Sequence, residues 1–379
     1  MMKRTLAALL ILCLSLSLLA GCGQAPAQEG ALGNGWQPER SLALDYATEF
    51  AVDYYAGGYK LLTLGDGSRF LVVPEGASLP DGIAPDIVPL YQPMKNLYLA
   101  ASAAMCLFNA LDGLDAIRFS GTKAESWYID NARTAMEQGQ ILFAGKYSQP
   151  DYEMLLDQDC PLAIESLMIE HAEQVRDKLQ ELGIAVLVDQ SSRESHPLGR
   201  TEWIKLYGAL LDREEEAAAL FDQQKAYLEG IDTQPTGKTV AFFYINSSGA
   251  VVARKPGDYI TKMIDLAGGT YVFQDLGESE KETSSVTMEM EAFFAAAKDA
   301  DYIIYNSTID GEVTTLDDLL QKSPLLAQMK AVQTDQVWCT SENMYQETTQ
   351  LGQMIQSFHQ IFSGQAGQTE QLPYLYRLH

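Results

Sequence analysis

Residues 201–231, TEWIKLYGALLDREEEAAALFDQQKAYLEGI, decide how this chain is divided. Apart from Gly208 and the end of the stretch, these residues include no Gly or Pro, and DREEEAAAL at 212–220 consists of strong helix formers. Acidic residues in the first turn suit the positive end of a helix dipole. Gly230 and the turn signal QPTG at 234–237 end the segment. We therefore predict one long helix at 212–231 that joins two halves of the chain.

Short apolar runs alternate with helical stretches on both sides of this helix. Such alternation predicts parallel α/β sheets. A glycine-bearing hairpin signal, GDG at 65–67, comes before the first of these runs. The predicted fold is α/β: two parallel-sheet lobes, at 40–211 (with an early β-hairpin) and 232–379, joined by the single helix. The expected strands lie at 96–101, 117–120, 162–165 and 185–188 in the first lobe, and at 239–245, 271–273, 302–305 and 336–339 in the second.

The length and charge of the chain restrict what it can bind. The 379 residues are enough for two domains with cores of their own. They include 26 basic and 51 acidic side chains, for a formal net charge of -25. Such a surface repels phosphate backbones and anionic lipid headgroups. We expect no nucleic-acid partner and no contact with a membrane other than through a lipid anchor.

The first residues have the pattern of an export signal. Lys3 and Arg4 come before an apolar run at 6–19, which ends in LAGC at 19–22. This ending looks like a bacterial lipobox, in which the thiol of Cys22 takes a diacylglycerol. We predict a lipoprotein signal peptide at 1–21, lipidation of Cys22 and a flexible tether at 22–39. The expected location is the outer face of the cytoplasmic membrane.

Cysteine and histidine usage gives no sign of a disulfide framework or a metal site. The cysteines at 106, 160 and 339 lie in apolar segments without CxxC spacing and are predicted to be small buried side chains. The four histidines lack ligand spacing. We predict no bound metal and no cofactor, although the ligand can itself carry iron or cobalt.

Two stretches of sequence are specific enough to compare with known families: ESHPLGRTEWI at 194–204 and the region 290–306, which ends in KDADYIIYN. They resemble the periplasmic-binding-protein class that serves iron–siderophore, haem and vitamin B12 importers. The resemblance covers the chain from about residue 96 onward. It implies a non-enzymatic solute-binding protein with a ligand cleft between the two lobes, an iron–siderophore, haem or cobamide as ligand and an ABC-type permease as partner.

The same resemblance implies a docking role for one glutamate in each lobe. By position these are Glu153 and Glu291, with Glu289 as a close rival. Each follows the same local pattern, a helix opening with a glutamate, then an acidic turn and an apolar strand. A carboxylate at a helix start can accept a bidentate arginine. It can equally just stabilise its own helix.

Ligand contacts are expected at the carboxyl ends of the strands, where doubly wound sheets bind ligands. Aromatic faces suit a chelate or macrocycle, and Arg or Tyr can hold anionic oxygens. For each residue, ordinary packing or turn formation is the alternative; His196, for instance, can define the start of a helix at Pro197. The candidates are Trp127, Tyr128, Glu194, His196, Tyr244, Asn246, Arg254, Tyr305 and Tyr345.

Two other classes of function remain as alternatives. SGTK at 120–123 matches the S-x-x-K motif of penicillin-recognising serine acyl-transfer enzymes, but the chain has no KTG. A surface adhesion or scaffold lipoprotein would need a macromolecular partner and no small-molecule cleft.

Overall fold

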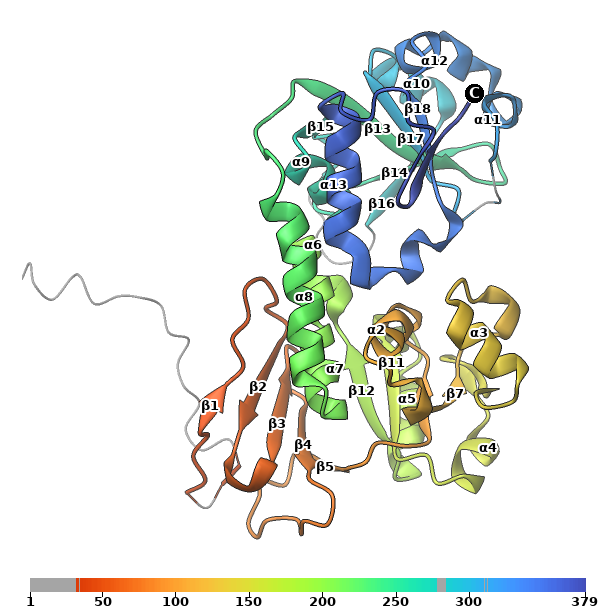
Figure 1. The fold of residues 1–379 in the computed structure, drawn as a ribbon. Helices are drawn as coiled ribbons and strands as arrows, with labels where there is room; N and C mark the ends of the chain where they lie inside the picture. The colour runs from red at the N-terminus through yellow and green to blue at the C-terminus, as the bar shows by residue number, and fades with distance from the viewer. Residues whose placement is uncertain (1–31, 34, 278–283, 310, 312) are drawn as a thin grey trace, which may run out of the picture.

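The computed structural model describes residues 32–33, 35–277, 284–309, 311 and 313–379. Within them the chain forms a lower and an upper lobe connected by helix α8 (Glu214–Glu229) (Figure 1). The predicted signal peptide, Cys22 and most of the tether lie outside the described residues.

An N-terminal β-sheet precedes the first lobe. The predicted hairpin is present as β3 and β4 around Gly67 (φ +85°), but it belongs to a sheet in the order β1-β2-β3-β4-β5. One face of this sheet lies in the main hydrophobic core and the other covers a smaller cluster. Its strands are β1 (Arg40–Ser41), β2 (Phe50–Tyr54), β3 (Lys60–Leu64), β4 (Arg69–Val73) and β5 (Ile87–Tyr91).

The first lobe has the parallel sheet that the sequence predicts. Its strands pair in the order β12-β11-β6-β7-β8, and every pairing is parallel. The strands are β6 (Leu97–Leu99), β7 (Ile117–Ser120), β8 (Leu142–Phe143), β11 (Leu162–Ser166) and β12 (Ala185–Asp189). The helices of the lobe are α2 (Met105–Ala110), α3 (Asp130–Glu137), α4 (Tyr152–Asp157) and α5 (Glu173–Glu181); β9 (Gly145–Lys146) and β10 (Gln149–Pro150) form a separate ribbon.

The connection between the lobes consists of α6 (Pro197–Glu202), α7 (Ile204–Leu211) and α8. The helix predicted at 212–231 is shorter at both ends. Asp212 has left-handed dihedral angles (φ +57°) and caps α7, so α8 begins only at Glu214. The ammonium group of the buried Lys60 pairs with Asp212 and Glu214, which ties the N-terminal sheet to the start of α8.

The second lobe has a mixed sheet where a parallel one was predicted. Strands β13, β15, β17 and β18 are parallel, while β14, β16, β19 and β20 add antiparallel pairings. The β13–β14 and β19–β20 pairs are hairpins, whereas helices separate β14 from β16 and β18 from β20 in the chain. The strands are β13 (Lys238–Ile245), β14 (Val251–Arg254), β15 (Gly269–Tyr271), β16 (Ser285–Met288), β17 (Tyr302–Tyr305), β18 (Val337–Thr340), β19 (Gln371–Leu372) and β20 (Leu375–Arg377). The helices are α9 (Tyr259–Leu266), α10 (Met290–Ala297), α11 (Leu316–Lys322), α12 (Lys330–Gln333) and α13 (Leu351–Phe362).

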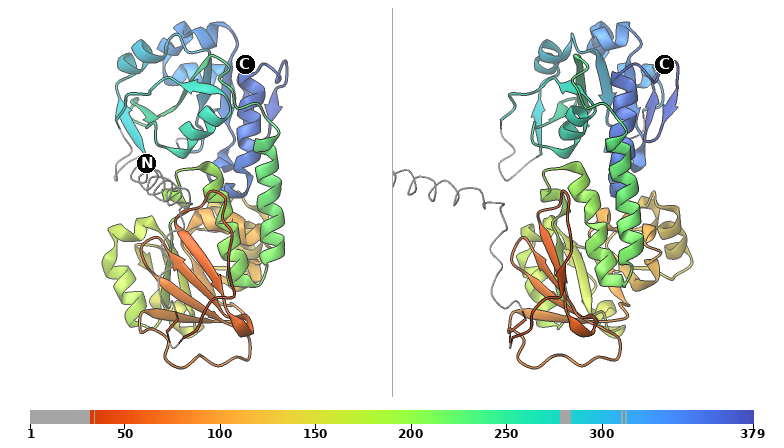
Figure 2. Two further views of the ribbon diagram at one scale, coloured as in Figure 1. Left: turned by 90° about the vertical axis from the view of Figure 1, so that its left-hand side faces the viewer. Right: turned by 60° about the vertical axis from the view of Figure 1, so that its left-hand side comes forward.

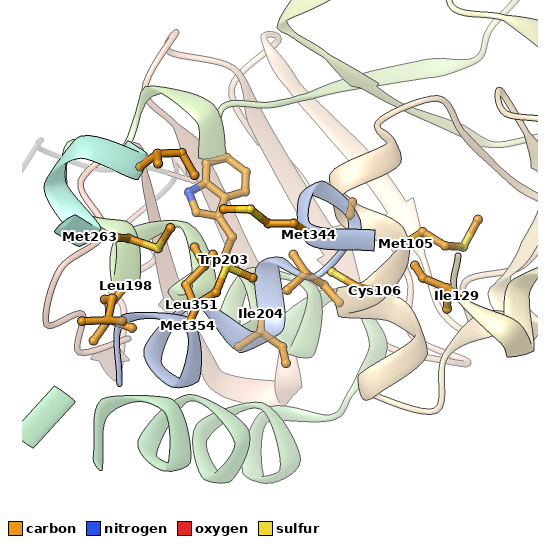
Figure 3. Close-up of a cluster of buried hydrophobic side chains, with 14 of the residues drawn as sticks. Met105, Cys106, Ile129, Leu198, Trp203, Ile204, Met263, Met344, Leu351 and Met354 are labelled. Atoms are coloured by element: carbon orange, nitrogen blue, oxygen red, sulfur yellow. The ribbon is translucent and has the colours of Figure 1, made fainter. Parts of the chain in front are cut away.

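One hydrophobic core continues through both lobes. Helix α13 packs against α8, as the views in Figure 2 show, and a Cβ on Gly352 of α13 would lie 2.1 Å from the backbone oxygen of Gln224 in α8. A cluster of methionine and other apolar side chains joins α2 and α6 of the lower lobe to α9 and α13 of the upper lobe (Figure 3). It includes Met105, Cys106, Leu198, Met263, Met344, Leu351 and Met354.

Candidate functional site between the lobes

Segments that follow the strands of both sheets meet between the lobes. The 3₁₀ turn η5 (Ala124–Ser126) comes after β7, and η9 (Glu342–Gln346) comes after β18. The side-chain amide of Gln346 donates to the backbone oxygen of Ser126 (2.8 Å), and its oxygen accepts from the backbone N–H of Tyr128 (2.9 Å). The carboxyl ends of the two sheets therefore face one another.

A polar cluster in the upper lobe lies next to this contact. Arg254 donates to the hydroxyl oxygen of Tyr345 and, at 3.1 Å, to the hydroxyl of Ser284. The amide nitrogen of Asn306 donates to the same Tyr345 oxygen at 3.0 Å. Thr308 and Thr340 donate to the amide oxygen of Asn306 and so fix which way this amide points.

A second arginine reaches the cluster from the lower lobe. The guanidinium carbon of Arg200, on α6, lies 3.8 Å from the ring centre of Tyr259 on α9. Arg200 also donates to the backbone oxygen of Ser191 (3.1 Å). The neighbouring Asp258 carboxylate is buried and lies 3.6 Å from Arg254. Burial raises the pKa of Asp258, while the charges of Arg254 and Arg200 oppose that shift.

The structure gives two of the predicted ligand residues internal roles. The buried Glu194 carboxylate accepts the backbone N–H groups of Thr48 and Glu49 and the indole N–H of Trp203 (2.9 Å). His196 caps α6 by accepting the N–H of Leu198. Each would have to give up these bonds to bind a ligand.

The ring of His196 also stacks on Tyr46, with 4.2 Å between ring centres. Burial lowers the pKa of His196. The imidazole therefore stays neutral and packed at physiological pH. Capping of α6 is a simpler explanation of His196 than contact with a ligand.

Other candidates divide between packing and exposure. Trp127 is buried and donates to Ser120 (3.3 Å), and Tyr305 is buried in the sheet. Asn246 closes the β13–β14 turn by accepting from Ser248 and Ala250. Tyr128 is 44% exposed beside the lobe contact, and Tyr244 is half-buried on β13.

The docking candidates occupy equivalent places in the two lobes. Glu153 and Glu291 are each the second residue of a helix, α4 and α10, and both are exposed. Helix α4 leads to β11 and α10 leads to β17, and each of these strands lies inside its sheet. Glu289 is the exposed N-cap residue of α10. The equivalence agrees with the predicted internal pattern and leaves the docking role itself a prediction.

The serine of the S-x-x-K motif is used in a turn. Ser120 is fully buried; its hydroxyl donates to the backbone oxygen of Thr122 and accepts from Trp127. Lys123 is exposed, with its ammonium 3.8 Å from Glu125. These contacts do not pair the serine with a base.

Two further observations concern metals and membranes. Among the described residues, no three His, Cys, Asp or Glu side chains are grouped so as to hold a metal ion. In the same part of the chain, no helix combines the length and hydropathy needed to cross a bilayer. Cys106, Cys160 and Cys339 are buried thiols, as predicted.

Arg200, Asp258 and Tyr259 were not among the residues predicted to contact ligand. Arg200 lies inside the motif at 194–204, and its charge close to the start of an apolar helix could have marked it as a candidate site residue. Asp258 and Tyr259 open α9, and nothing in their spacing indicates that α6 packs against that helix.

Comparisons with known proteins agree with this architecture. Curated relatives include two uncharacterized lipoproteins of Methanocaldococcus jannaschii. One is 25% identical over 76% of this chain and 70% of its own length, and the other is 23% identical over 88% and 86%.

Among solved structures, a haem-binding protein of Pseudomonas aeruginosa is 16% identical, with a TM-score of 0.55 over 75% of this chain and 98% of its own. The TroA-like periplasmic binding protein FepB of Veillonella parvula is 13% identical, with a TM-score of 0.57 over 76% and 96%. At these identities the likeness shows the fold. The family model for periplasmic binding proteins matches residues 108–343, which is more than half of the chain. The chain belongs to the periplasmic binding protein family, as its motifs predicted.

Proposed function

We propose that this protein is an extracytoplasmic solute-binding lipoprotein that delivers an iron–siderophore, haem or cobamide to an ABC-type importer. The observation that carries the proposal is the polar cluster of Arg254, Tyr345 and Asn306 at the ends of the upper-lobe strands, facing the lower lobe. In α/β sheets, ligands bind in this position. Family membership supports the transport role.

The ligand class is tested by native mass spectrometry of the full chain in detergent. The panel contains a ferric tris-catecholate, a ferric trihydroxamate, haem and cyanocobalamin. We expect one class to bind as a one-to-one complex that survives dilution. If none binds and the protein instead captures a macromolecule, the adhesion alternative replaces this proposal.

Anchoring is tested separately at Cys22. In the proposed maturation, cleavage before Cys22 follows the attachment of lipid to its thiol. A Cys22→Ser variant should therefore remain unprocessed or be released, and metabolic labelling with a fatty acid should be lost. Continued labelling and normal processing of the variant would remove the anchor from the proposal.

A further inference from the structure

A short segment before the second strand is held in place by two carboxylates. Residues 45–49, which we call the strap, lie between β1 and β2 and belong to no helix or strand. The backbone N–H groups of residues 45–47 donate to the buried Glu202, each at 2.8 Å. Those of residues 48 and 49 donate to the buried Glu194, at 2.9 and 3.1 Å. All five N–H groups of the strap thus make hydrogen bonds to a charged acceptor, which are stronger than neutral ones.

The strap binds helix α6 at both of its ends. Glu194 precedes α6, and Glu202 is the last residue of the helix. The ring of Tyr46, in the strap, stacks on His196, which is the N-cap residue of α6. A movement of α6 away from the strap would break these hydrogen bonds and leave two buried carboxylates without donors, which is costly. The strap therefore fixes the position of α6.

Helix α6 also binds the upper lobe. Its residue Thr201 is buried, and the hydroxyl group donates to the backbone oxygen of Thr348 at 2.8 Å. Thr348 begins the 3₁₀ turn η10 (Thr348–Gln350), directly after the turn η9 that ends at Gln346. The side chain of Gln346 in turn accepts the backbone N–H of Tyr128 across the contact between the lobes. A short path of hydrogen bonds and adjacent residues thus leads from the strap to the lobe contact.

We propose that the strap is a positioning element for the lobe contact: through α6 it holds residues 346–348 where Gln346 can bond to the lower lobe. The strap lies outside residues 108–343, which the family model matches. Coupling between two places in a protein is reciprocal, so opening of the lobe contact must loosen the strap as much as release of the strap loosens the contact. The coupling requires no ligand, and its failure would leave the proposed solute-binding function standing.

Hydrogen exchange of the full chain in detergent, resolved to single residues, measures both ends of this path without a ligand. The backbone N–H of Tyr128 reports the lobe contact, because it donates to Gln346. The N–H groups of residues 45–49 report the strap. Both exchange by local opening, whereas the N–H groups of β11, which lies inside its sheet, report unfolding of the whole lobe. Local release and a general loss of stability are thereby measured separately.

Two variants release the strap from different sides. Tyr46→Ala removes the stack on α6, and Glu194→Gln replaces one of the two acceptors. Each should raise the exchange rate of the Tyr128 N–H at least about fivefold, which is the lower end of typical coupling between sites. The control is Asp86→Asn, since Asp86 is 58% exposed and pairs with Arg69 elsewhere in the N-terminal sheet. The control should leave the exchange of Tyr128 unchanged.

The reciprocal variant is Gln346→Ala, with Gln328→Ala, at an exposed position of the same lobe, as its control. Gln346→Ala should raise the exchange rates of residues 45–49 by a similar factor, and Gln328→Ala should not change them. Unchanged exchange of Tyr128 in the strap variants, or of the strap in Gln346→Ala, would overturn the proposal. An equal rise in the β11 N–H groups would also overturn it, because the substitutions would then act through general stability. If Glu194→Gln folds poorly, Tyr46→Ala and the reciprocal variant decide.

Discussion

Replacing Glu202 by Gln should destabilise the whole protein, because its buried carboxylate holds the N-terminal segment to α6. The carboxylate is 0% exposed. It accepts the backbone N–H groups of Asp45, Tyr46 and Ala47, each at 2.8 Å, and the ammonium of Lys205 at 2.7 Å. The three backbone donors come from a segment that is 155 to 157 residues away along the chain.

The size of the effect follows from which bonds glutamine can keep. Its amide oxygen can replace Oε2 and retain Tyr46 and Ala47. Its NH₂ group then replaces Oε1 and faces Lys205, which is also a donor and only 11% exposed. Breaking a buried ion pair by removing one charge costs about 3–5 kcal/mol. We expect the free energy of unfolding to fall by about that amount.

Denaturant unfolding, followed by far-UV circular dichroism, measures this change. The matched control is Glu216→Gln on α8, because that carboxylate is 53% exposed and its pairing with Arg213 is a surface ion pair. The control should stay within about 1 kcal/mol of wild type. If the two substitutions had equal, small effects, the reasoning would be refuted. The bonds of the Glu202 carboxylate to Lys205 and to residues 45–47 would then contribute no more to stability than a surface ion pair.

Three other perturbations follow from the structure. Gly352→Ala should lower the free energy of unfolding by about 2–5 kcal/mol, because the new Cβ meets the Gln224 carbonyl. Thermal unfolding measures this change, and a value below about 0.5 kcal/mol would contradict the close approach. Glu165 is fully buried without a hydrogen-bond partner among the described residues, and burial raises its pKa to about 8. Between about pH 4.5 and pH 8 the carboxyl group is ionised in the unfolded chain but protonated in the folded protein. The free energy of unfolding should therefore fall by up to about 1.4 kcal/mol per pH unit as the pH rises through this range. Glu165→Gln should remove that slope, and an identical pH dependence of the two proteins would rule it out. The double variant Glu153→Ala/Glu291→Ala should keep ligand affinity but lose uptake, more than either single variant; unchanged uptake at normal expression would return both residues to ordinary helix starts.

The central strands could be predicted because they are buried on both faces. Strand β17, with the sequence YIIY, is buried at every residue and begins and ends where the apolar run indicates. Strand β7 also has the predicted bounds, although its Arg118 is only half-buried. The two lobes and their linking helix follow from the same alternation. The position of Tyr345 after β18 also follows from it, but its contact with Arg254, at the end of the antiparallel strand β14, does not.

What the sequence could not give depends on contacts between distant segments. The antiparallel strands of the upper lobe are short, and β16 and β20 pair with β14 and β18 across intervening helices. Asp212 belongs to a run of helix formers, but it adopts left-handed dihedral angles, so that the chain turns there and α7 packs beside α8 with Gly208 close to Ala217. Arg200 becomes a site residue only because α6 packs on α9, which no local pattern records.

The shared core limits how the lobes can respond to a ligand. Met105, Met344, Leu351 and Met354 are buried in one cluster that receives side chains from both lobes (Figure 3). Exposing each of these side chains would cost about 1.5–3 kcal/mol, or about 6–12 kcal/mol for the four. A ligand that binds with micromolar affinity supplies about 8 kcal/mol in total, most of which would be consumed. We therefore expect the lobes to remain joined, and the ligand-bound state to differ at the strand-end segments, where Gln346 bonds to Ser126 and Tyr128.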